Sequence, residues 1–302
     1  MSCGRTKAEA IVKNVLASRS VQDFINVLKD PAKSSNFFSI ATDASNHKNR
    51  KIFPLVVRYF DPISGVKNRL LDFTEQADET ANGTHNLIKF SLDTHKLDIK
   101  NLTSYCADNA NVNYGQHNSV FKLLQEDNKN VLKANCSNHI LHNATKHASD
   151  GLDVDIEMII LKIYGHFSVS AKRREELKSF FDLVDAELEI VRHVPTRWLT
   201  LASAVDRLIQ NWLPIKSYFK RVNCCPKILK KHFSDKDPEK KCVIEAYLNF
   251  FSNIGAVLVQ SAKILETANL TTMECYSVMQ CVGNKIQQRI EDRFFGTATE
   301  KF

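Results

Sequence analysis

Glycine and proline are scarce in this sequence. Its 302 residues include nine Gly and seven Pro, which is too few for a long low-complexity tract. Hydrophobic residues make up 43% of the chain and charged residues 25%, a composition typical of folded globular proteins. A chain of this length can form two domains with a sizeable core.

Long apolar runs are also missing. No segment reaches the roughly 18 apolar residues of a membrane helix, and the nearest, 156–167, contains Glu157, Lys162 and His166. The first ten residues are polar, so we expect neither a signal peptide nor a membrane partner. Eight Cys in such a chain indicate reduced thiols. We therefore expect a nuclear or cytoplasmic protein.

The charge balance is mildly basic. The 41 Lys and Arg exceed the 34 Asp and Glu, which gives a formal net charge of +7 and a pI near 8.9. Such an excess fits a polyanionic partner such as DNA but is too small to establish one.

Two stretches share one pattern. Residues 36–45 (NFFSIATDAS) end an apolar run on Asp43, and residues 102–110 (LTSYCADNA) end a β-prone run on Asp108. Short apolar runs bounded by turn-forming residues predict buried strands, and we expect the chain to turn after Asp43. A carboxylate held at the end of a buried strand suits a divalent cation. The alternative is a solvated Asp at a strand end.

The spacing of apolar residues predicts a mixed sheet followed by helices. Further strands are predicted at 52–60, 66–73 and 131–135, with helices between them from 80 and near 120. This element order is typical of an RNase H-like five-stranded sheet with flanking helices, in which the first and fourth strands are neighbours. Asp43 and Asp108 would then meet, and two carboxylates about 4 Å apart repel by roughly 4 kcal/mol at an effective dielectric near 20.

The two ends of the chain have helical periodicity. Residues 8–30 predict two short helices with Ser20 as a cap between them. From about residue 150 the apolar stripes have helix spacing throughout. We therefore predict an N-terminal helical segment, an RNase H-like core and an all-α domain, at 1–35, 36–150 and 151–302.

Four motifs in this order resemble the hAT superfamily of DNA transposases, in particular its domesticated or truncated members. They are SIATDAS at 39–45, YCADNAN at 105–111, CSNH at 136–139 and PTRWLT at 195–200. The resemblance extends over about 36–215. It implies an RNase H-like domain that is followed by a helical insertion domain.

The resemblance also implies roles for individual residues. In such transposases, three carboxylates bind two divalent metals that activate a water or a 3′ hydroxyl against a DNA phosphate. Asp43 and Asp108 match the first two carboxylates, so Mg²⁺ or Mn²⁺ is the implied cofactor of an active enzyme, and an inactive one has none. Cys136 and His139 match a pair that lies beside this centre.

Other residues are candidates for contact with nucleic acid. Arg197 and Trp198 match a pair whose indole stacks on a flipped-out base in active relatives, with plain packing as the alternative. Basic clusters are candidates for phosphate contacts, or alternatively for the solvated sides of helices: Lys172, Arg173 and Arg174, then Lys216, Lys220 and Arg221, then Lys227, Lys230 and Lys231.

A structural zinc site is the alternative interpretation of Cys136, His139 and His142. No second Cys/His pair lies at a suitable spacing from them. Four further residues are spaced wrongly for a zinc finger: Cys224, Cys225, His232 and Cys242. We therefore do not favour zinc.

The third carboxylate of the family is not found. The chain ends at Phe302 within the predicted helices, before a recognisable dimerisation region, so the sequence predicts no oligomeric state. No later acid lies in a matching context, including Glu266, Glu274, Glu291 and Glu300. We expect a transposase-derived protein without transposition activity that binds DNA or protein partners. The alternatives are a residual metal-dependent DNA nuclease and a protein-interaction module with no nucleic-acid role.

Overall fold

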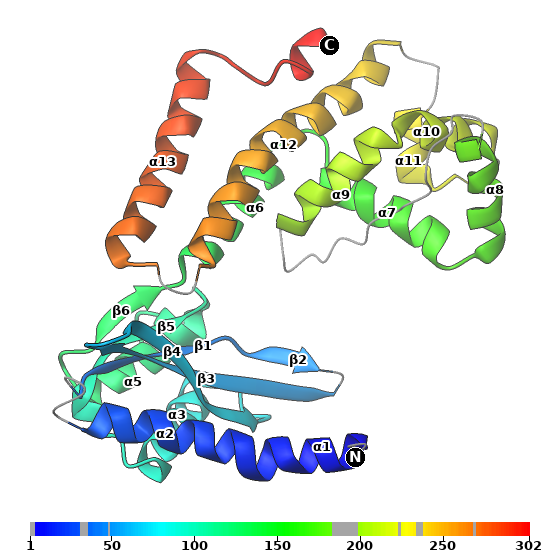
Figure 1. The fold of residues 1–302 in the computed structure, drawn as a ribbon. Helices are drawn as coiled ribbons and strands as arrows, with labels where there is room; N and C mark the ends of the chain where they lie inside the picture. The colour runs from blue at the N-terminus through cyan, green and yellow to red at the C-terminus, as the bar shows by residue number, and fades with distance from the viewer. Residues whose placement is uncertain are drawn as a thin grey trace. The chain divides into compact units, whose positions relative to one another are not determined.

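The computed structural model describes residues 4–30, 36–47, 49–182, 199–222, 225–233, 238–267 and 270–302. The chain divides into two compact units, Met1–His139 and Ile140–Phe302. A mixed sheet lies in the first unit, and the described part of the second unit is helical (Figure 1).

The sheet of the first unit contains parallel and antiparallel pairs. β1 lies between β3, with which it is antiparallel, and β5, with which it is parallel. β6 extends the parallel side, and β4 pairs with the far edge of β3. This arrangement confirms the predicted RNase H-like mixed sheet and adds β2 as a short sixth strand. The strands are β1 (Phe38–Thr42), β2 (Ser45–His47), β3 (Arg50–Asp61), β4 (Gly65–Glu75), β5 (Leu102–Ala107) and β6 (Leu132–Asn135).

The prediction that the chain turns after Asp43 is wrong. Thr42 pairs with Leu55 and Ser45 pairs with Ile52, so β2 continues the register of β1 along β3. This continuous register places Pro54, which has no N–H to donate, opposite Asp43. The chain therefore stays extended through Asp43, and Asp43 lies in a short interruption between two collinear strands.

One helical run precedes the sheet. The prediction of two helices separated by a cap at Ser20 is wrong, because the chain is helical from Arg5 to Lys29. α1 (Arg5–Ile11) leads through a π-helical segment (Val12–Ala17) into α2 (Ser18–Lys29) without a break. Only the α2 part buries side chains: Phe24, Ile25 and Leu28.

The core of the first unit lies between the sheet and its helices. Buried side chains alternate along β3, as expected for a strand with one face in the core. Helices α3 (Ala81–Thr94) and α5 (Val120–Asp127) pack their apolar faces into the same core. The Thr80 side chain accepts a hydrogen bond from Gly83 N–H and fixes the start of α3. A short helix, α4 (Asn111–Tyr114), follows β5 directly.

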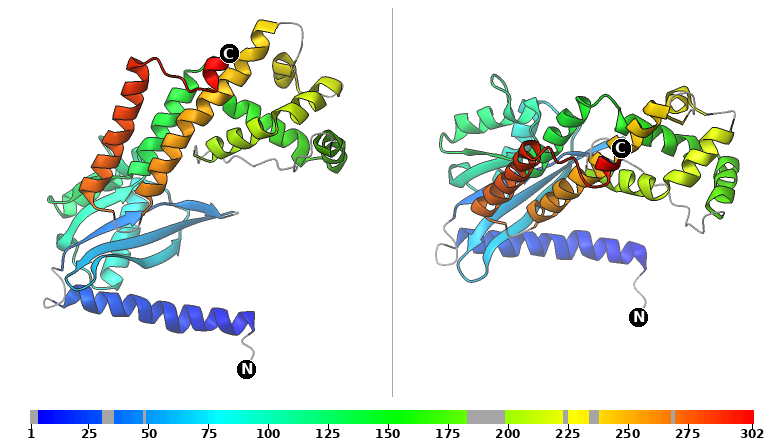
Figure 2. Two further views of the ribbon diagram at one scale, coloured as in Figure 1. Left: turned by 45° about the horizontal axis from the view of Figure 1, so that its top comes forward. Right: turned by 90° about the horizontal axis from the view of Figure 1, so that it is seen from above.

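The second unit has two apolar clusters. The larger one joins α7 to α11 with the first half of α12, and the smaller one joins α6, α12 and α13. α12 and α13 lie side by side in both views of Figure 2. The helices are α6 (Ser137–Asp150), α7 (Ile156–Ser168), α8 (Ala171–Asp182), α9 (Leu199–Gln210), α10 (Trp212–Arg221), α11 (Lys227–Phe233), α12 (Pro238–Leu265) and α13 (Thr272–Glu291).

Helix α12 corrects our statement on long apolar segments. Its stretch Val243–Leu265 is long and apolar enough to cross a membrane by length and composition. Leu248, Phe251 and Leu258 of this stretch are buried in the two clusters of the second unit. Core helices that join two apolar clusters have the same composition, and we interpret α12 as one of them.

Candidate functional site

Three neighbouring strands end at the same level of the sheet. The parallel register pairs Ala41 with Cys106, and its continuation by two residues places Asp43 beside Asp108. The β5–β6 register pairs Ala107 with Asn135, and Cys136 N–H continues that ladder by donating to the Ala107 carbonyl at 3.2 Å. The registers thus place Asp43, Asp108 and Cys136 at the same end of three neighbouring strands.

Asp108 is held by side chains that the sequence analysis did not single out. Asn113 Nδ2 donates to Asp108 Oδ1 at 2.7 Å, and Ala110 N–H donates to the same oxygen at 3.1 Å. The hydroxyl of Tyr105, a buried residue, donates to Asn113 Oδ1 at 2.7 Å. Asp108 therefore has a fixed orientation. The sequence signal for this arrangement is the Asp-Asn-Ala turn that leads at once into a helix.

Tyr114 closes the same end of the sheet. Its hydroxyl accepts from Ala107 N–H at 2.9 Å, and it lies within donating distance of the Tyr105 and Ala134 carbonyls, at 2.9 and 3.1 Å. Burial raises the pKa of Tyr114, so the hydroxyl keeps its proton and can donate. Tyr114 thus bridges β5 and β6 immediately before Asp108.

Cys136 and His139 interact at the start of α6. Burial raises the pKa of Cys136, but hydrogen bonds from the side chain and N–H of His139 outweigh this effect, and the net pKa lies below its usual value. The hydrogen bond to Cys136 raises the pKa of His139, burial opposes this, and attraction to Asp43 and Asp108 adds to it. The net pKa of His139 therefore lies above its usual value.

The matching protein family covers the sheet end that carries Asp43 and Asp108. Residues 4–118 match the family model DUF4371, described as ZMYM1/FAM200, RNase-like domain. The match begins with α1, includes both aspartates and ends before β6, Cys136 and His139. This part of the chain is therefore similar to the RNase-like domain of the ZMYM1/FAM200 family. No curated protein shows significant similarity to the chain.

The donor set of the RNase-like domain does not match a two-metal centre. Two divalent ions need several carboxylate ligands with free oxygens. Asp43 and Asp108 provide two carboxylates, and one oxygen of Asp108 already accepts two hydrogen bonds. No group of three His, Cys, Asp or Glu side chains within the described ranges could hold a metal ion. We therefore derive no metal-dependent step from this site.

Cys136, His139 and His142, the residues of the alternative zinc site, all lie within the described ranges, where no group of three such side chains could hold a metal ion. Cys224 and the His232 side chain lie outside the described residues. Among the later acids, Glu274 has a structural role, because it forms a capping box with Thr271 at the start of α13.

The predicted nucleic-acid contacts lie in the second unit or outside the described part of the chain. Arg197 and Trp198 belong to 183–198 and are not described. Lys172 forms an ion pair with Glu176 at 3.9 Å. The Arg173 guanidinium donates to the carbonyl of His166 at 3.1 Å, and Arg174 is exposed. Two of the three predicted α8 cations thus have partners within the protein.

Proposed function

We propose that the chain is a hAT transposase-derived protein that lacks transposition activity and acts by binding DNA or protein partners. One observation carries the proposal. Asp43 and Asp108 end neighbouring parallel strands as in an RNase-like active centre, but one Asp108 oxygen is bound by Asn113 and no third ligand joins them in the described ranges. An arrangement of this kind keeps the fold of a nuclease and gives poor control over a two-metal displacement.

The proposal has consequences for cofactor and location. A binding protein of this kind requires no Mg²⁺ or Mn²⁺ for its role. We propose that it acts in the nucleus or the cytoplasm, where its thiols stay reduced.

A nicking assay tests the proposal. Purified protein is incubated with linear and hairpin DNA in Mn²⁺ or Mg²⁺, beside the variants Asp43→Asn and Asp108→Asn. We expect the same background cleavage from all three proteins. A matched control is Glu126→Gln, which removes an exposed carboxylate elsewhere in the domain.

The second candidate function is a residual metal-dependent nuclease, which the shared level of Asp43 and Asp108 favours. Cleavage by the wild type and by Glu126→Gln, lost in both aspartate variants, would establish this candidate and overturn the first. A partner chain or another acid would then supply the remaining ligand.

A further inference from the structure

A segment of the second unit carries positive charge without any acid. Between Asp206 and Asp235 there is no Asp or Glu, and the intervening residues include seven basic ones. They are Arg207, Lys216, Lys220, Arg221, Lys227, Lys230 and Lys231. On α8, by contrast, Glu175, Glu176 and Asp182 accompany the cations. The net charge of +7 is therefore concentrated around α10 and α11.

Lys216 has partners within the protein. The Lys216 ammonium forms an ion pair with Glu245 and lies 5.7 Å from the Trp212 ring centroid, with a side chain only 16% exposed. Lys216 therefore fastens α10 to α12 and is not available to a partner.

Four other cations are exposed on α10 and α11. Lys220 and Arg221 end α10, and Lys227 and Lys230 lie one turn apart on α11, so they share a face of that helix. We call these four residues the α10–α11 basic surface. The two helices lie next to each other in Figure 1.

The packing beneath this surface holds it in place. Phe219 of α10 stacks on Phe233 of α11 with ring centroids 5.1 Å apart, and Trp212 lies 5.3 Å from the same ring. Leu229 of α11 is fully buried. The inward faces of both helices are thus anchored, and the basic side chains emerge from a fixed backbone.

We propose that the α10–α11 basic surface binds the phosphate backbone of nucleic acid. This inference rests on the proposed binding function and assigns it to a surface. Exposed Lys and Arg side chains that neutralise phosphates release counterions, which supplies most of the affinity of sequence-independent binding. The α8 cluster fits this role less well, because the acids on the same helix offset its positive charge.

A nucleic acid fits this surface better than a membrane does. The apolar side chains of α11 turn inward, with Leu229 and Phe233 buried and Ile228 partly buried against the core. Binding to a lipid surface gains strength from apolar side chains that enter the acyl boundary. The basic face of α11 presents none, and α10 exposes Leu213. A surface that binds phosphates by charge alone suits a nucleic-acid strand, because such a strand is flexible and densely charged.

The test measures binding to labelled duplex DNA, single-stranded DNA and duplex RNA by fluorescence anisotropy across a series of salt concentrations. The test variant carries Lys220→Gln, Arg221→Gln, Lys227→Gln and Lys230→Gln. We expect it to bind at least about tenfold more weakly. Its slope of log affinity against log salt on duplex DNA should become less steep by about 0.9 for each phosphate that is no longer neutralised.

A second fourfold variant controls for net charge. Arg5→Gln, Lys7→Gln, Lys13→Gln and Arg19→Gln remove the same number of cations from the exposed N-terminal helix, and we expect affinity within about twofold of wild type. Thermal melting verifies that both variants are folded. Equal weakening in both variants, no weakening in the first, or binding that ignores salt would overturn the proposal, as would binding to anionic vesicles but not to nucleic acid. None of these outcomes depends on the nicking assay.

Discussion

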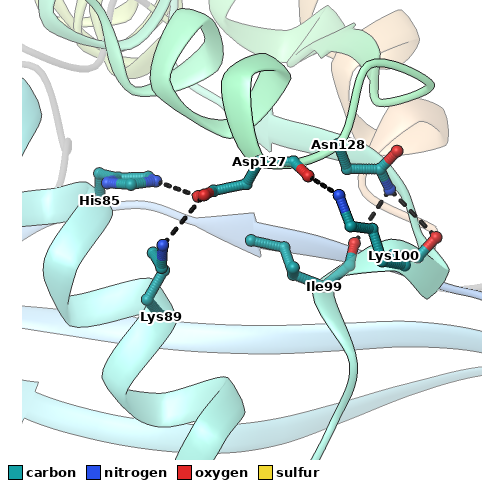
Figure 3. A network of polar contacts seen from close by, with 6 residues as sticks. All are labelled: His85, Lys89, Ile99, Lys100, Asp127 and Asn128. Carbon is teal, nitrogen blue, oxygen red and sulfur yellow. Dashed lines mark hydrogen bonds and ion pairs between the residues drawn. The ribbon is translucent and has the colours of Figure 1, made fainter.

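His85 Nε2 lies 2.7 Å from Oδ2 of Asp127, and this contact joins α3 to the end of α5 (Figure 3). Lys89, one turn further along α3, donates to the other Asp127 oxygen at 3.0 Å. The ammonium of Lys100 reaches the Asp127 backbone carbonyl. With side chains 13% and 23% exposed, His85 and Asp127 are shielded enough for the contact to contribute to stability.

We expect Asp127→Asn to lower the free energy of unfolding at pH 7 by about 1–2 kcal/mol. Hydrogen bonds to charged groups contribute about 1.5–3 kcal/mol, and the partial exposure of Asp127 reduces that contribution. Burial raises the pKa of Asp127, but hydrogen bonds from Lys89 and His85 and attraction to both outweigh it, so the net pKa lies below its usual value. A carboxyl group whose pKa is lower in the folded than in the unfolded state stabilises the fold at pH values above its unfolded-state pKa, which is about 4. That contribution disappears as pH falls through the folded-state pKa.

Urea unfolding of wild type and Asp127→Asn between pH 3 and pH 7 checks this expectation, and the two should converge in acid. Glu126→Gln is the matched control, because Glu126 is the exposed neighbour of Asp127 on α5. It should stay within about 0.5 kcal/mol of wild type. A constant gap between Asp127→Asn and wild type across this range would contradict the assignment.

Substitution of Asn128, at the same end of α5, should reduce stability more than substitution of Asp127. Its Nδ2 lies 2.9, 3.1 and 3.0 Å from the carbonyls of Ile99, Lys100 and Leu102, and Asn130 N–H donates to its Oδ1. The residue is 4% exposed, so Asn128→Ala leaves buried polar groups without partners. We expect a loss of about 2–3 kcal/mol.

Asn128→Asp separates hydrogen bonding from packing. It has nearly the same shape but replaces the donating amide with a carboxylate facing three carbonyls. It should therefore destabilise the domain at pH 7 at least as much as Asn128→Ala, and less at acid pH where the carboxyl is protonated. Chemical denaturation provides the measurement, and a stability of Asn128→Asp at pH 7 above that of Asn128→Ala would contradict this role.

The strands and helices of the RNase-like domain could be predicted because local patterns and the fold agree. β3 alternates buried and less buried residues over its length, and α3 starts at a Thr cap. The same short apolar runs predicted the adjacent placement of Asp43 and Asp108, since the element order makes their strands neighbours.

Other features depend on tertiary contacts that a linear pattern does not contain. Small and polar residues after Asp43 indicate a turn, yet pairing with β3 keeps that segment extended as β2. Asn113 and Tyr105 lie on opposite sides of Asp108 in sequence, and only the folding back of α4 brings their side chains together. The Asp-Asn-Ala turn indicates that a helix follows Asp108, but it does not identify Asn113 and Tyr105 as the side chains that hold Asp108.

Cys136 should react with iodoacetamide at lower pH than an ordinary thiol, because alkylation requires the thiolate. The hydrogen bonds from His139 and the start of α6 hold the pKa of Cys136 below its usual value against the effect of burial. Mass spectrometry of the alkylated protein gives the rate for each cysteine, and the pH midpoint for Cys136 should lie below that of an ordinary thiol.

His139→Gln should move that midpoint upward, because it removes the side-chain hydrogen bond and the attraction of the imidazolium. Cys281, an exposed thiol on α13, is the internal reference and should not change. An unchanged Cys136 midpoint in His139→Gln would show that the helix start alone sets the reactivity.

Asn113→Asp should convert the sheet end into a better cation site. Asn113 Nδ2 donates to Asp108 Oδ1 at 2.7 Å, so the substitution exchanges a donor for a second carboxylate at contact distance. Without metal, repulsion between the two carboxylates should destabilise the domain by about 1–3 kcal/mol. Asp43 follows the neighbouring strand at the same level, so three carboxylates would then lie at this end of the sheet. Three carboxylates in one place are typical of divalent cation sites.

Thermal melting in a Mn²⁺ titration measures this gain. An ion that binds only the folded state raises stability by about 2.7 kcal/mol at a hundred times its dissociation constant, so Tm of Asn113→Asp should rise with Mn²⁺ more than that of wild type. Asn111→Asp, on the exposed first residue of α4, adds the same charge on a side chain other than the one that donates to Asp108. A Tm response of Asn111→Asp equal to that of Asn113→Asp would mean that Mn²⁺ responds to net charge alone. The Asn113–Asp108 hydrogen bond would then have no part in setting the Mn²⁺ affinity of this RNase-like domain.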